Sequence, residues 1–340
     1  MPTQSSTSFM GSNIQIISVL LVLVIFGYHL TRKCEPTEPI VEYTVSQKWI
    51  PRNIGIKQRH LPSFLIIGAA KCGTGALQKY LEYHPQVERS IPWEVHYFEH
   101  NADKPLDWYR EQMPLTHAEV LTFEKSAGYL YSKKAAIKAA NDLPGVKVLA
   151  LICDPVDRAF SAFLEYEKEM EYSSFDQYLE KNIDDAKKCI LEEGHSCRDV
   201  EFDNLADMHE NLLHSKVKDF RVLFQSLYEP GLTYWKDNLE PGNLLVLNQT
   251  DLMYQTADTI LTVQDFLNLE PLLTKDNFQV NEETGFACFV ENGQDKMSCI
   301  GKNKSRSRSK NGLKMSENAR LKLESFFKDV VDFNKEHVFE

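Results

Sequence analysis

The chain lacks the excess of positive charge that nucleic-acid-binding proteins usually carry. Its 49 Asp and Glu residues outnumber its 38 Lys and Arg residues, which leaves a formal net charge of −11. Positive charge is concentrated in one short stretch, at Lys302, Lys304, Arg306, Arg308 and Lys310. We therefore expect no nucleic acid partner, and a polyanion would have to bind in a local basic channel.

Charged side chains are also absent from residues 14–30, which are nearly continuous Ile, Leu and Val. The length of this segment lies at the lower limit for a helix that crosses a bilayer. A signal-anchor helix is favoured over a buried core helix because the run has no polar stripe. It is favoured over a cleaved signal peptide because Tyr28, His29 and Leu30 are not the small residues of a cleavage site. We therefore expect a membrane span at 14–30 after a short N-terminal tail at 1–13.

The charges around this segment and the cysteines indicate opposite membrane orientations. Residues 1–13 lack Lys and Arg, whereas Arg32 and Lys33 follow the span, which favours a cytosolic C-terminus. Two cysteine pairs have the spacing of small disulfide loops, which form in an oxidising lumen, and four unrelated thiols are the alternative. These pairs are Cys189 with Cys197 and Cys288 with Cys299. N-glycosylation triplets begin at Asn248 and Asn303.

The remainder of the chain divides into a stem and one large domain. Residues 31–60 contain prolines and no sustained hydrophobic period, as is typical of a stem. From residue 61, apolar runs alternate with helical patterns, which predicts an α/β fold with a central parallel sheet flanked by helices. Strands are expected at 64–68, 120–123, 146–152 and 244–248, and helices at 74–83, 132–141, 155–170, 220–239, 257–267 and 316–334. Residues 171–215 interrupt this alternation and are interpreted as an insertion in a domain that spans 61–340.

The first predicted strand runs into a loop suited to an anion. Glycines at 73 and 75 let backbone N–H groups approach an anion, the following helix contributes its positive N-terminus, and Lys71 and Thr74 supply donors. An ordinary glycine-rich turn is the alternative. A nucleoside triphosphatase or nucleotide kinase would place the lysine directly after the last glycine, whereas Lys71 precedes Gly73. A metal-binding Asp after an apolar strand is also lacking, apart from Asp154. This favours a loop that binds a phosphosulfate without a metal.

Three separated motifs resemble those of the heparan sulfate sulfotransferases. They are Lys71-Cys-Gly-Thr74, the segment WEVHYF at 93–98 and the segment EKSAGY at 124–129. Within that family the chain is most similar to the glucosaminyl 3-O-sulfotransferases and to the sulfotransferase domain of the N-deacetylase/N-sulfotransferases. The resemblance covers residues 61–340 apart from the insertion, and it implies a P-loop-like sulfotransferase fold. It also implies 3′-phosphoadenosine 5′-phosphosulfate as the sulfate donor, with no metal required.

The resemblance implies a role for each catalytic candidate. Glu94 corresponds to the base that deprotonates the acceptor hydroxyl. His96, two residues on, would face the same side of an extended segment and hold Glu94 or the acceptor. Lys71 would neutralise the leaving phosphate oxygen, Lys125 would contact the acceptor or the sulfuryl group, and Glu99 stands where the family usually has Asp. A structural histidine and a solvated lysine are the alternatives for His96 and Lys125.

Donor contacts are implied at three places in the chain. They are the loop residues Lys71, Cys72, Gly73, Thr74 and Gly75, then Cys153 and Ser161 around the start of a helix that Asp154 can cap, then Lys304, Ser305, Arg306, Ser307 and Arg308. For the last set, a disordered loop rich in Ser, Arg and Lys is the alternative.

Three positions depart from the family pattern. Cys153 and Gly75 replace arginines, and Ala287 replaces an aromatic residue before the first disulfide cysteine. Losing one charge-assisted hydrogen bond to a phosphate costs about 1.5–3 kcal/mol.

The sequence thus predicts a single-pass type II Golgi membrane protein, anchored through 14–30, with a lumenal sulfotransferase domain and a glycosaminoglycan acceptor of the heparan type. The rival hypothesis is a catalytically weak or inactive paralogue that binds glycan or regulates a partner. It would retain Glu94 and Lys71 but bind donor too weakly to turn over.

Overall fold

The computed structural model describes residues 55–166, 172–192, 220–282, 287–291, 297–300 and 314–338. All of them belong to one compact unit that begins at Lys48. Within these ranges, no helix combines the length and the apolar character that a membrane crossing requires. The predicted span at 14–30, and the part of the predicted stem that precedes residue 55, lie outside the described residues, so both stay predictions.

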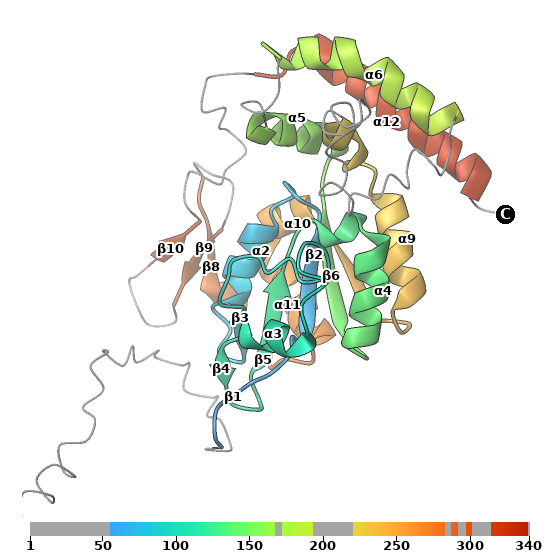
Figure 1. The fold of residues 1–340 in the computed structure, drawn as a ribbon. Helices are drawn as coiled ribbons and strands as arrows, with labels where there is room; N and C mark the ends of the chain where they lie inside the picture. Colours follow the sequence, from blue (N-terminus) through green and yellow to red (C-terminus); the bar gives the residue numbers. More distant parts are fainter. Residues whose placement is uncertain are drawn as a thin grey trace, which may run out of the picture. The chain divides into compact units, whose positions relative to one another are not determined.

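A five-stranded parallel sheet forms the centre of this unit, in the order β3-β5-β2-β6-β7 (Figure 1). Its strands are β2 (Phe64–Gly68), β3 (Val87–Arg89), β5 (Leu121–Lys125), β6 (Lys147–Ile152) and β7 (Leu244–Asn248). Each neighbouring pair is parallel. All five residues of β2 are buried, as expected for a central strand with both faces covered. The predicted α/β fold is confirmed.

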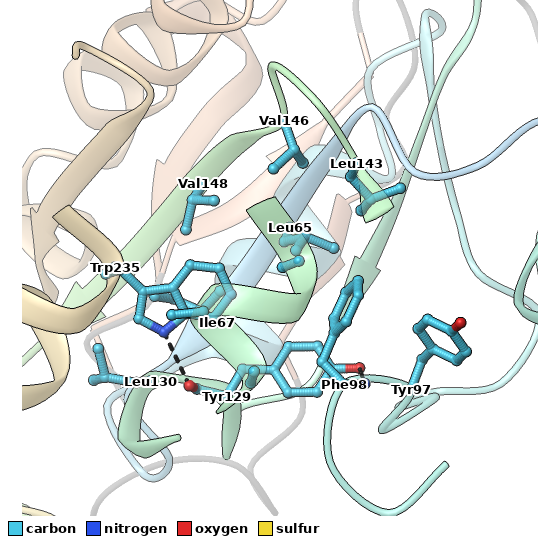
Figure 2. Packing of buried hydrophobic residues seen from close by; sticks show 14 of the residues in the cluster. Leu65, Ile67, Tyr97, Phe98, Tyr129, Leu130, Leu143, Val146, Val148 and Trp235 are labelled. Carbon is cyan, nitrogen blue, oxygen red and sulfur yellow. Dashed lines mark hydrogen bonds between the residues drawn. The ribbon is translucent and has the colours of Figure 1, made fainter. Parts of the chain in front are cut away.

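Helices cover both faces of this sheet. Alternate side chains of β2 point to opposite faces, so Phe64 and Ile66 join one apolar cluster and Leu65 and Ile67 join another. The first cluster includes α2 (Thr74–Leu81), α10 (Gln249–Tyr254) and α11 (Thr256–Phe266). The second includes α3 (Leu106–Glu111), the short helix η1 (Tyr129–Tyr131), α4 (Lys133–Asp142) and α9 (Tyr228–Asn238). Figure 2 shows this second cluster, where the indole N–H of Trp235 donates to the carbonyl of Tyr129 at 3.0 Å.

A third apolar cluster lies beyond the carboxyl ends of the strands. It packs α5 (Pro155–Tyr166), α6 (Phe175–Glu192) and α12 (Glu317–Val338) together, and Figure 1 shows these helices gathered at one end of the unit. Helix α6 therefore occupies the first part of the segment interpreted as an insertion. Asp154 caps α5 as expected, because its Oδ1 accepts the backbone N–H of Asp157 at 2.8 Å.

Two small antiparallel sheets complete the described fold. Strand β1 (Gln58–Arg59) pairs with β4 (Leu115–Thr116). Strand β9 (Ala287–Val290) lies between β8 (Phe278–Val280) and β10 (Met297–Cys299). Cys288 and Cys299 face each other in the β9–β10 register and form a disulfide bond.

The prediction of a single helix at 220–239 is wrong. Residues 220–224 are helical, the chain breaks at 225–227, and α9 begins at Tyr228. The reason is Pro230, whose ring would clash with the carbonyl of Ser226 in a continuous helix. In the observed structure Pro230 lies in the first turn of α9, where a missing N–H has no cost.

Candidate active site

The candidate site lies at the carboxyl edge of the sheet, where β5, β2 and β6 end side by side. Lys125 is the last residue of β5 and pairs in register with Ile66 of β2. Strand β2 continues into residues 69–73, which we call the anion loop, and β6 continues into Cys153 and Asp154. In open parallel sheets this edge is where ligands bind.

The anion loop leads into the uncapped N-terminus of α2. Gly73 precedes the helix with a φ of 93°, and no side chain caps the helix start. Lys71 also has a left-handed backbone, with a φ of 76°. The positive φ favours glycine here, and a Cβ at Gly73 would also lie 3.2 Å from Nε2 of the buried Gln249, which would have to shift slightly. The exposed N–H groups at such a helix start attract phosphate or sulfate.

One face of α5 lies against this loop. The guanidinium Nε of Arg158 donates to the carbonyl of Ala70 at 3.2 Å, and Glu165 forms an ion pair with Lys71 at 3.1 Å. Ser161 lies between them at helical spacing, so it shares the face that meets the loop. The predicted donor residues Lys71, Gly73, Thr74 and Ser161 are thus brought together, and Gly75 lies in the first turn of α2 beside them.

Glu94 is held between two cationic side chains. Its carboxylate accepts hydrogen bonds from Nζ of Lys125 and from Nε2 of His96, the latter at 3.1 Å. The other ring nitrogen of His96 contacts Glu99 at 3.0 Å. The expected contact of His96 with Glu94 forms, but the segment is not extended as predicted, because His96 has a φ of 52°.

These contacts set the charge of the cluster. Burial by itself would raise the pKa of Glu94, but the hydrogen bond from His96 and the charge of Lys125 outweigh it and lower the pKa to about 2. The hydrogen bonds of His96 to Glu94 and then to Glu99 raise the pKa of the imidazole to about 10, against the opposing effect of burial. At neutral pH Glu94 is therefore ionised and His96 carries a positive charge.

The end of β5 also fixes the backbone that carries Glu94. The carboxylate of Glu124, which is fully buried, accepts the N–H of Val95 at 3.2 Å and the hydroxyl of Tyr109 at 3.1 Å. Oγ of Ser126 accepts the N–H of His96 at 2.9 Å. Burial raises the pKa of Glu124. Sequence reasoning assigned no role to Glu124 or Ser126, although both lie in the EKSAGY motif beside Lys125.

A missing side chain makes room for Glu99. A Cβ at Gly128 would lie 2.6 Å from Oε1 of Glu99, so a side chain at this position would displace the Glu99 carboxylate from where it contacts His96. Ligand atoms of His96, Glu99 and His100 lie within 4.8 Å of one another and could hold a metal ion. Both ring nitrogens of His96 already contact carboxylates, however, and would have to release one of them first.

Trp93 presents an aromatic surface next to Glu94. The indole is 38% exposed. Nζ of Lys125 lies 5.0 Å from its ring centroid, Nζ of Lys79 lies 5.4 Å away, and Cζ of Arg89 lies 5.7 Å away. Lys79 and Arg89 share Glu82 as an ion-pair partner, at 2.5 and 3.1 Å. An apolar ring surrounded by cations suits an anionic sugar.

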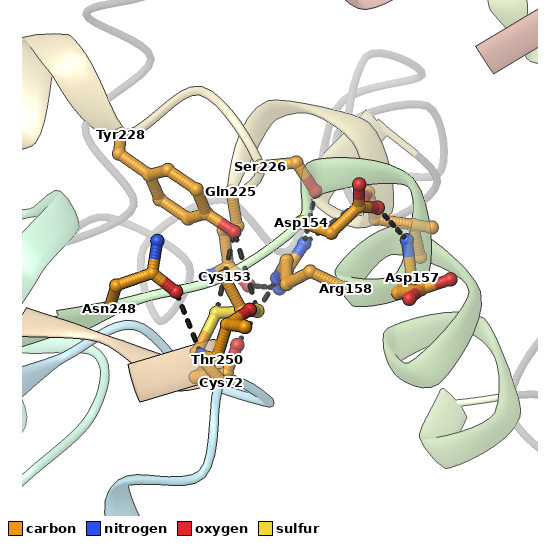
Figure 3. The surroundings of a disulfide bond; sticks show 12 residues. Cys72, Cys153, Asp154, Asp157, Arg158, Gln225, Ser226, Tyr228, Asn248 and Thr250 are labelled. Carbon is orange, nitrogen blue, oxygen red and sulfur yellow. Dashed lines mark hydrogen bonds between the residues drawn. A yellow bond between two sulfur atoms is a disulfide. The ribbon is translucent and has the colours of Figure 1, made fainter. Parts of the chain in front are cut away.

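Cys72 and Cys153, both expected near the donor, form a disulfide bond with each other (Figure 3). The hydroxyl of Tyr228 lies 3.3 Å from Sγ of Cys72 and 3.7 Å from Sγ of Cys153. The sequence did not predict this bond. The described residues do not include the side chain of Cys189, nor Cys197 or residues 304–308, so the roles predicted for these positions stay predictions.

A family model described as "Sulfotransferase domain" matches residues 61–324. Heparan sulfate glucosamine 3-O-sulfotransferase 3B1 of Mus musculus is 28% identical over 254 residues, which are 74% of this chain and 58% of that protein. Bifunctional heparan sulfate N-deacetylase/N-sulfotransferase 4 of Mus musculus is 28% identical over 281 residues, or 79% of this chain and 29% of that protein. The chain thus spans little more than half the length of the 3-O-sulfotransferase.

Among solved structures, a sulfotransferase from Alicyclobacillus acidocaldarius superposes with a TM-score of 0.53. The match covers 81% of this chain and 94% of that one at 20% identity. Because the identity is low, this likeness bears on the fold alone, which is the P-loop-like fold expected from the sequence.

Proposed function

Because the chain belongs to the sulfotransferase domain family, we propose that it transfers sulfate from 3′-phosphoadenosine 5′-phosphosulfate to a hydroxyl or amine of a heparan-sulfate-like polysaccharide. One observation carries this proposal. Glu94 is clamped between Lys125 and His96 at the same sheet edge as the anion loop with Lys71. A base held against the last residue of β5 and a cation in the loop after the adjacent strand β2 therefore share one edge of the sheet, where two bound substrates could meet.

The anion loop and α5 would bind the donor. Backbone N–H groups of residues 73–75 and the uncapped start of α2 would hold the 5′-phosphosulfate. Lys71 would exchange Glu165 for the bridging oxygen and neutralise the charge that develops there. Ser161 would contact the 3′-phosphate. Cys153 cannot replace an arginine here, because its sulfur is bonded to Cys72.

The chemical step follows from the clamp around Glu94. The acceptor oxygen attacks the sulfur, the bond from sulfur to the phosphate oxygen breaks, and the acceptor proton passes to Glu94. A carboxylate with a pKa near 2 is a poor base, so one cation must leave it as the acceptor binds. Lys125 suits this task, since moving its ammonium to a sulfuryl oxygen would both stabilise the transferring group and raise the pKa of Glu94.

Acceptor contacts are expected at Trp93, directly before the base. Its exposed ring would pack on a sugar, and Lys79 and Arg89 would attract a carboxylate or sulfate on that sugar. A glycosaminoglycan provides both features in each repeat.

We further propose a single-pass type II Golgi membrane protein with a lumenal catalytic domain. The apolar segment at 14–30 would be the anchor. Two disulfide bonds, Cys72–Cys153 and Cys288–Cys299, support an oxidising compartment. Asn248 is exposed at the end of β7, where a glycan could be attached. A glycosidase-sensitive shift in gel mobility that disappears in Asn248→Gln, or in the matching Asn303→Gln variant, would support this placement. An unshifted protein would contradict it.

The central test is Glu94→Gln. This change keeps the shape of the side chain but removes the base, so the transfer rate should fall by about 10²–10⁴-fold. Affinity for the desulfated donor, 3′-phosphoadenosine 5′-phosphate, should change by less than about twofold, since Glu94 contacts the acceptor. Radiolabelled sulfate transfer and calorimetry measure the two quantities, with Glu180→Gln on the exposed side of α6 as the control. A mutant that keeps most of its rate would exclude Glu94 as the base.

A further inference from the structure

We infer that the Cys72–Cys153 disulfide and Tyr228 form a positioning unit that holds the anion loop in its donor-binding shape. The inference rests on the proposed function, because it concerns the same donor site. It adds a covalent link inside that site to the contacts already described.

The disulfide joins two segments that are both proposed to contact the donor. Cys72 lies within the anion loop, and Cys153 follows β6, the strand adjacent to β2 in the sheet. Both side chains are buried, at 0% and 8% exposure. The bond therefore links the loop proposed for the phosphosulfate to the segment that starts α5, where Ser161 is proposed to contact the 3′-phosphate.

Tyr228 completes the unit from a third element. Its hydroxyl reaches both sulfurs from the first residue of α9 (Figure 3). A disulfide sulfur has no hydrogen, so the Tyr228 O–H must be the donor. Burial raises the pKa of this tyrosine, which keeps the hydroxyl protonated.

Arg158 supplies a second, non-covalent link between the same elements. It is 1% exposed and donates to Ala70 of the loop, and it also donates to the carbonyl of Val222 at 2.9 Å and to Oε1 of Gln225 at 2.6 Å. The segment at 222–226 leads directly into Tyr228. Two links thus tie the anion loop to the start of α9, one through Arg158 and one through the disulfide.

The loop needs such links because its backbone is unfavourable. Lys71 and Gly73, on both sides of Cys72, have left-handed φ values of 76° and 93°. For a non-glycine residue such as Lys71 this conformation is unfavourable, because its Cβ lies too close to the following carbonyl oxygen. A loop fixed in this form before the donor arrives avoids an ordering cost on binding, so its affinity is higher than that of a relaxed loop.

The same link makes donor binding sensitive to reduction. A dithiol would supply two electrons and two protons, the Cys72 and Cys153 sulfurs would become thiols, and the dithiol would close to its own disulfide. Cys72 would then be a free thiol in a buried site, so a reagent reaches it only where the released loop opens, and its alkylation reports that opening.

Calorimetry with 3′-phosphoadenosine 5′-phosphate tests the unit. The variant Cys72→Ser/Cys153→Ser should bind this ligand at least about tenfold more weakly than the wild type, since a mobile loop must be ordered on binding. The matched control is Cys288→Ser/Cys299→Ser, which removes a disulfide from the β9–β10 pair and should change the affinity by less than about twofold. Melting temperatures of both variants separate a local change from general destabilisation.

Two further measurements keep the inference testable if the double variant folds poorly. Tyr228→Phe keeps the disulfide but removes its hydrogen-bond donor, and it should weaken ligand binding about twofold to tenfold. Wild type treated with dithiothreitol should lose affinity and become alkylated at Cys72, with the bound ligand protecting that thiol. If the wild type binds no ligand, the proposed function fails. If the wild type binds and both the serine variant and Tyr228→Phe bind equally well, the inference fails while the function stands.

Discussion

At the scale of single residues, His96 acts as the cation between two carboxylates. Its folded-state pKa is raised from 6.5 to about 10, so the folded protein binds this proton more tightly than the unfolded chain does. A raised pKa stabilises the protein fully below the unfolded value, and the effect is lost as pH rises through the folded value. Glu94 has the opposite sign, because its lowered pKa adds stability above 4.5 that is lost as pH falls through about 2.

We predict that the difference in unfolding free energy between the wild type and His96→Gln depends on pH. Both contributions are present between pH 4.5 and 6.5, so the wild type should exceed the variant in stability most clearly there. The difference should shrink steadily toward pH 10 as the imidazolium of the wild type loses its proton. Urea unfolding at a series of pH values measures it. A difference that stays constant across this range would show that His96 is not the charged centre of the cluster.

Glu165 is a second residue whose replacement should change donor affinity. Its carboxylate forms an ion pair with Lys71, and the donor would have to displace it. The pair lies 3.1 Å apart and Glu165 is largely exposed. Exposed ion pairs contribute about 0.2–1 kcal/mol, so Glu165→Gln should tighten donor-product binding by about 1.4- to 5-fold. Glu324→Gln on α12 removes a comparable exposed carboxylate away from the loop and serves as the control in the same calorimetric titration. Weaker binding in Glu165→Gln would mean that Glu165 helps to hold Lys71 in place.

The Cys72–Cys153 bond was missed because it is not local in the sequence. Glu94, His96 and Lys125 lie in short motifs whose chemistry is visible locally. Cys72 and Cys153 are separated by 81 residues in the sequence and meet only because β2 and β6 are neighbours in the sheet. Local spacing indicated Cys288 with Cys299, which do form a bond, but it could not indicate a pair that depends on strand order.

At the scale of elements, strands β2 and β6 were predictable because they are buried on both faces and are therefore continuous apolar runs in the sequence. The strands expected at 64–68, 146–152 and 244–248 agree with β2, β6 and β7 to within one residue. The prediction of one helix at 220–239 was wrong because hydrophobic periodicity does not take into account the steric clash that Pro230 would cause inside a continuous helix. Helix α10 was not expected, since it follows β7 without a loop and starts at a cap formed by Asn248.

Helix α5 connects the donor site to the third apolar cluster, and this gives an element-scale prediction. One face of α5 meets the anion loop, and it also packs in the cluster with α6 and α12, where Leu323 is fully buried. Leu323→Ala should destabilise the protein by about 2–5 kcal/mol through the cavity it leaves. Because α5 would lose support, affinity for the donor product should fall by about threefold or more, whereas the Glu94 cluster rests on other elements.

Hydrogen exchange resolves these effects by element. Faster exchange is expected in α5 and α12 of the Leu323→Ala variant, with little change in β5. The control is Leu321→Ala, on the exposed side of the same helix. An equal increase of the exchange rates in β5 and α5 would show that the helical cluster and the sheet unfold as one unit.

At the scale of the whole molecule, the net charge of −11 opposes the proposed acceptor. A sulfated glycan is a polyanion, so the protein repels it at long range, while Lys79, Arg89 and Lys125 around Trp93 attract it nearby. Salt screens the long-range part first, since the screening length falls from about 30 Å at 0.01 M to about 8 Å at 0.15 M. The ion pairs of Lys79 and Arg89 with Glu82 weaken the local attraction further.

The balance of these two effects predicts an unusual salt dependence. For a highly sulfated oligosaccharide, kcat/KM should rise by about twofold or more between 0.01 and 0.15 M salt, because screening removes more repulsion than attraction. An unsulfated oligosaccharide of the same length should respond less, and donor-product affinity at each salt concentration corrects for changes at the anion loop. A steep decrease with salt would show that a basic channel dominates acceptor binding despite the acidic chain. In that case the charges at 302–310, outside the described residues, would be the first to replace, and Arg306→Ser with Arg308→Ser should flatten the decrease.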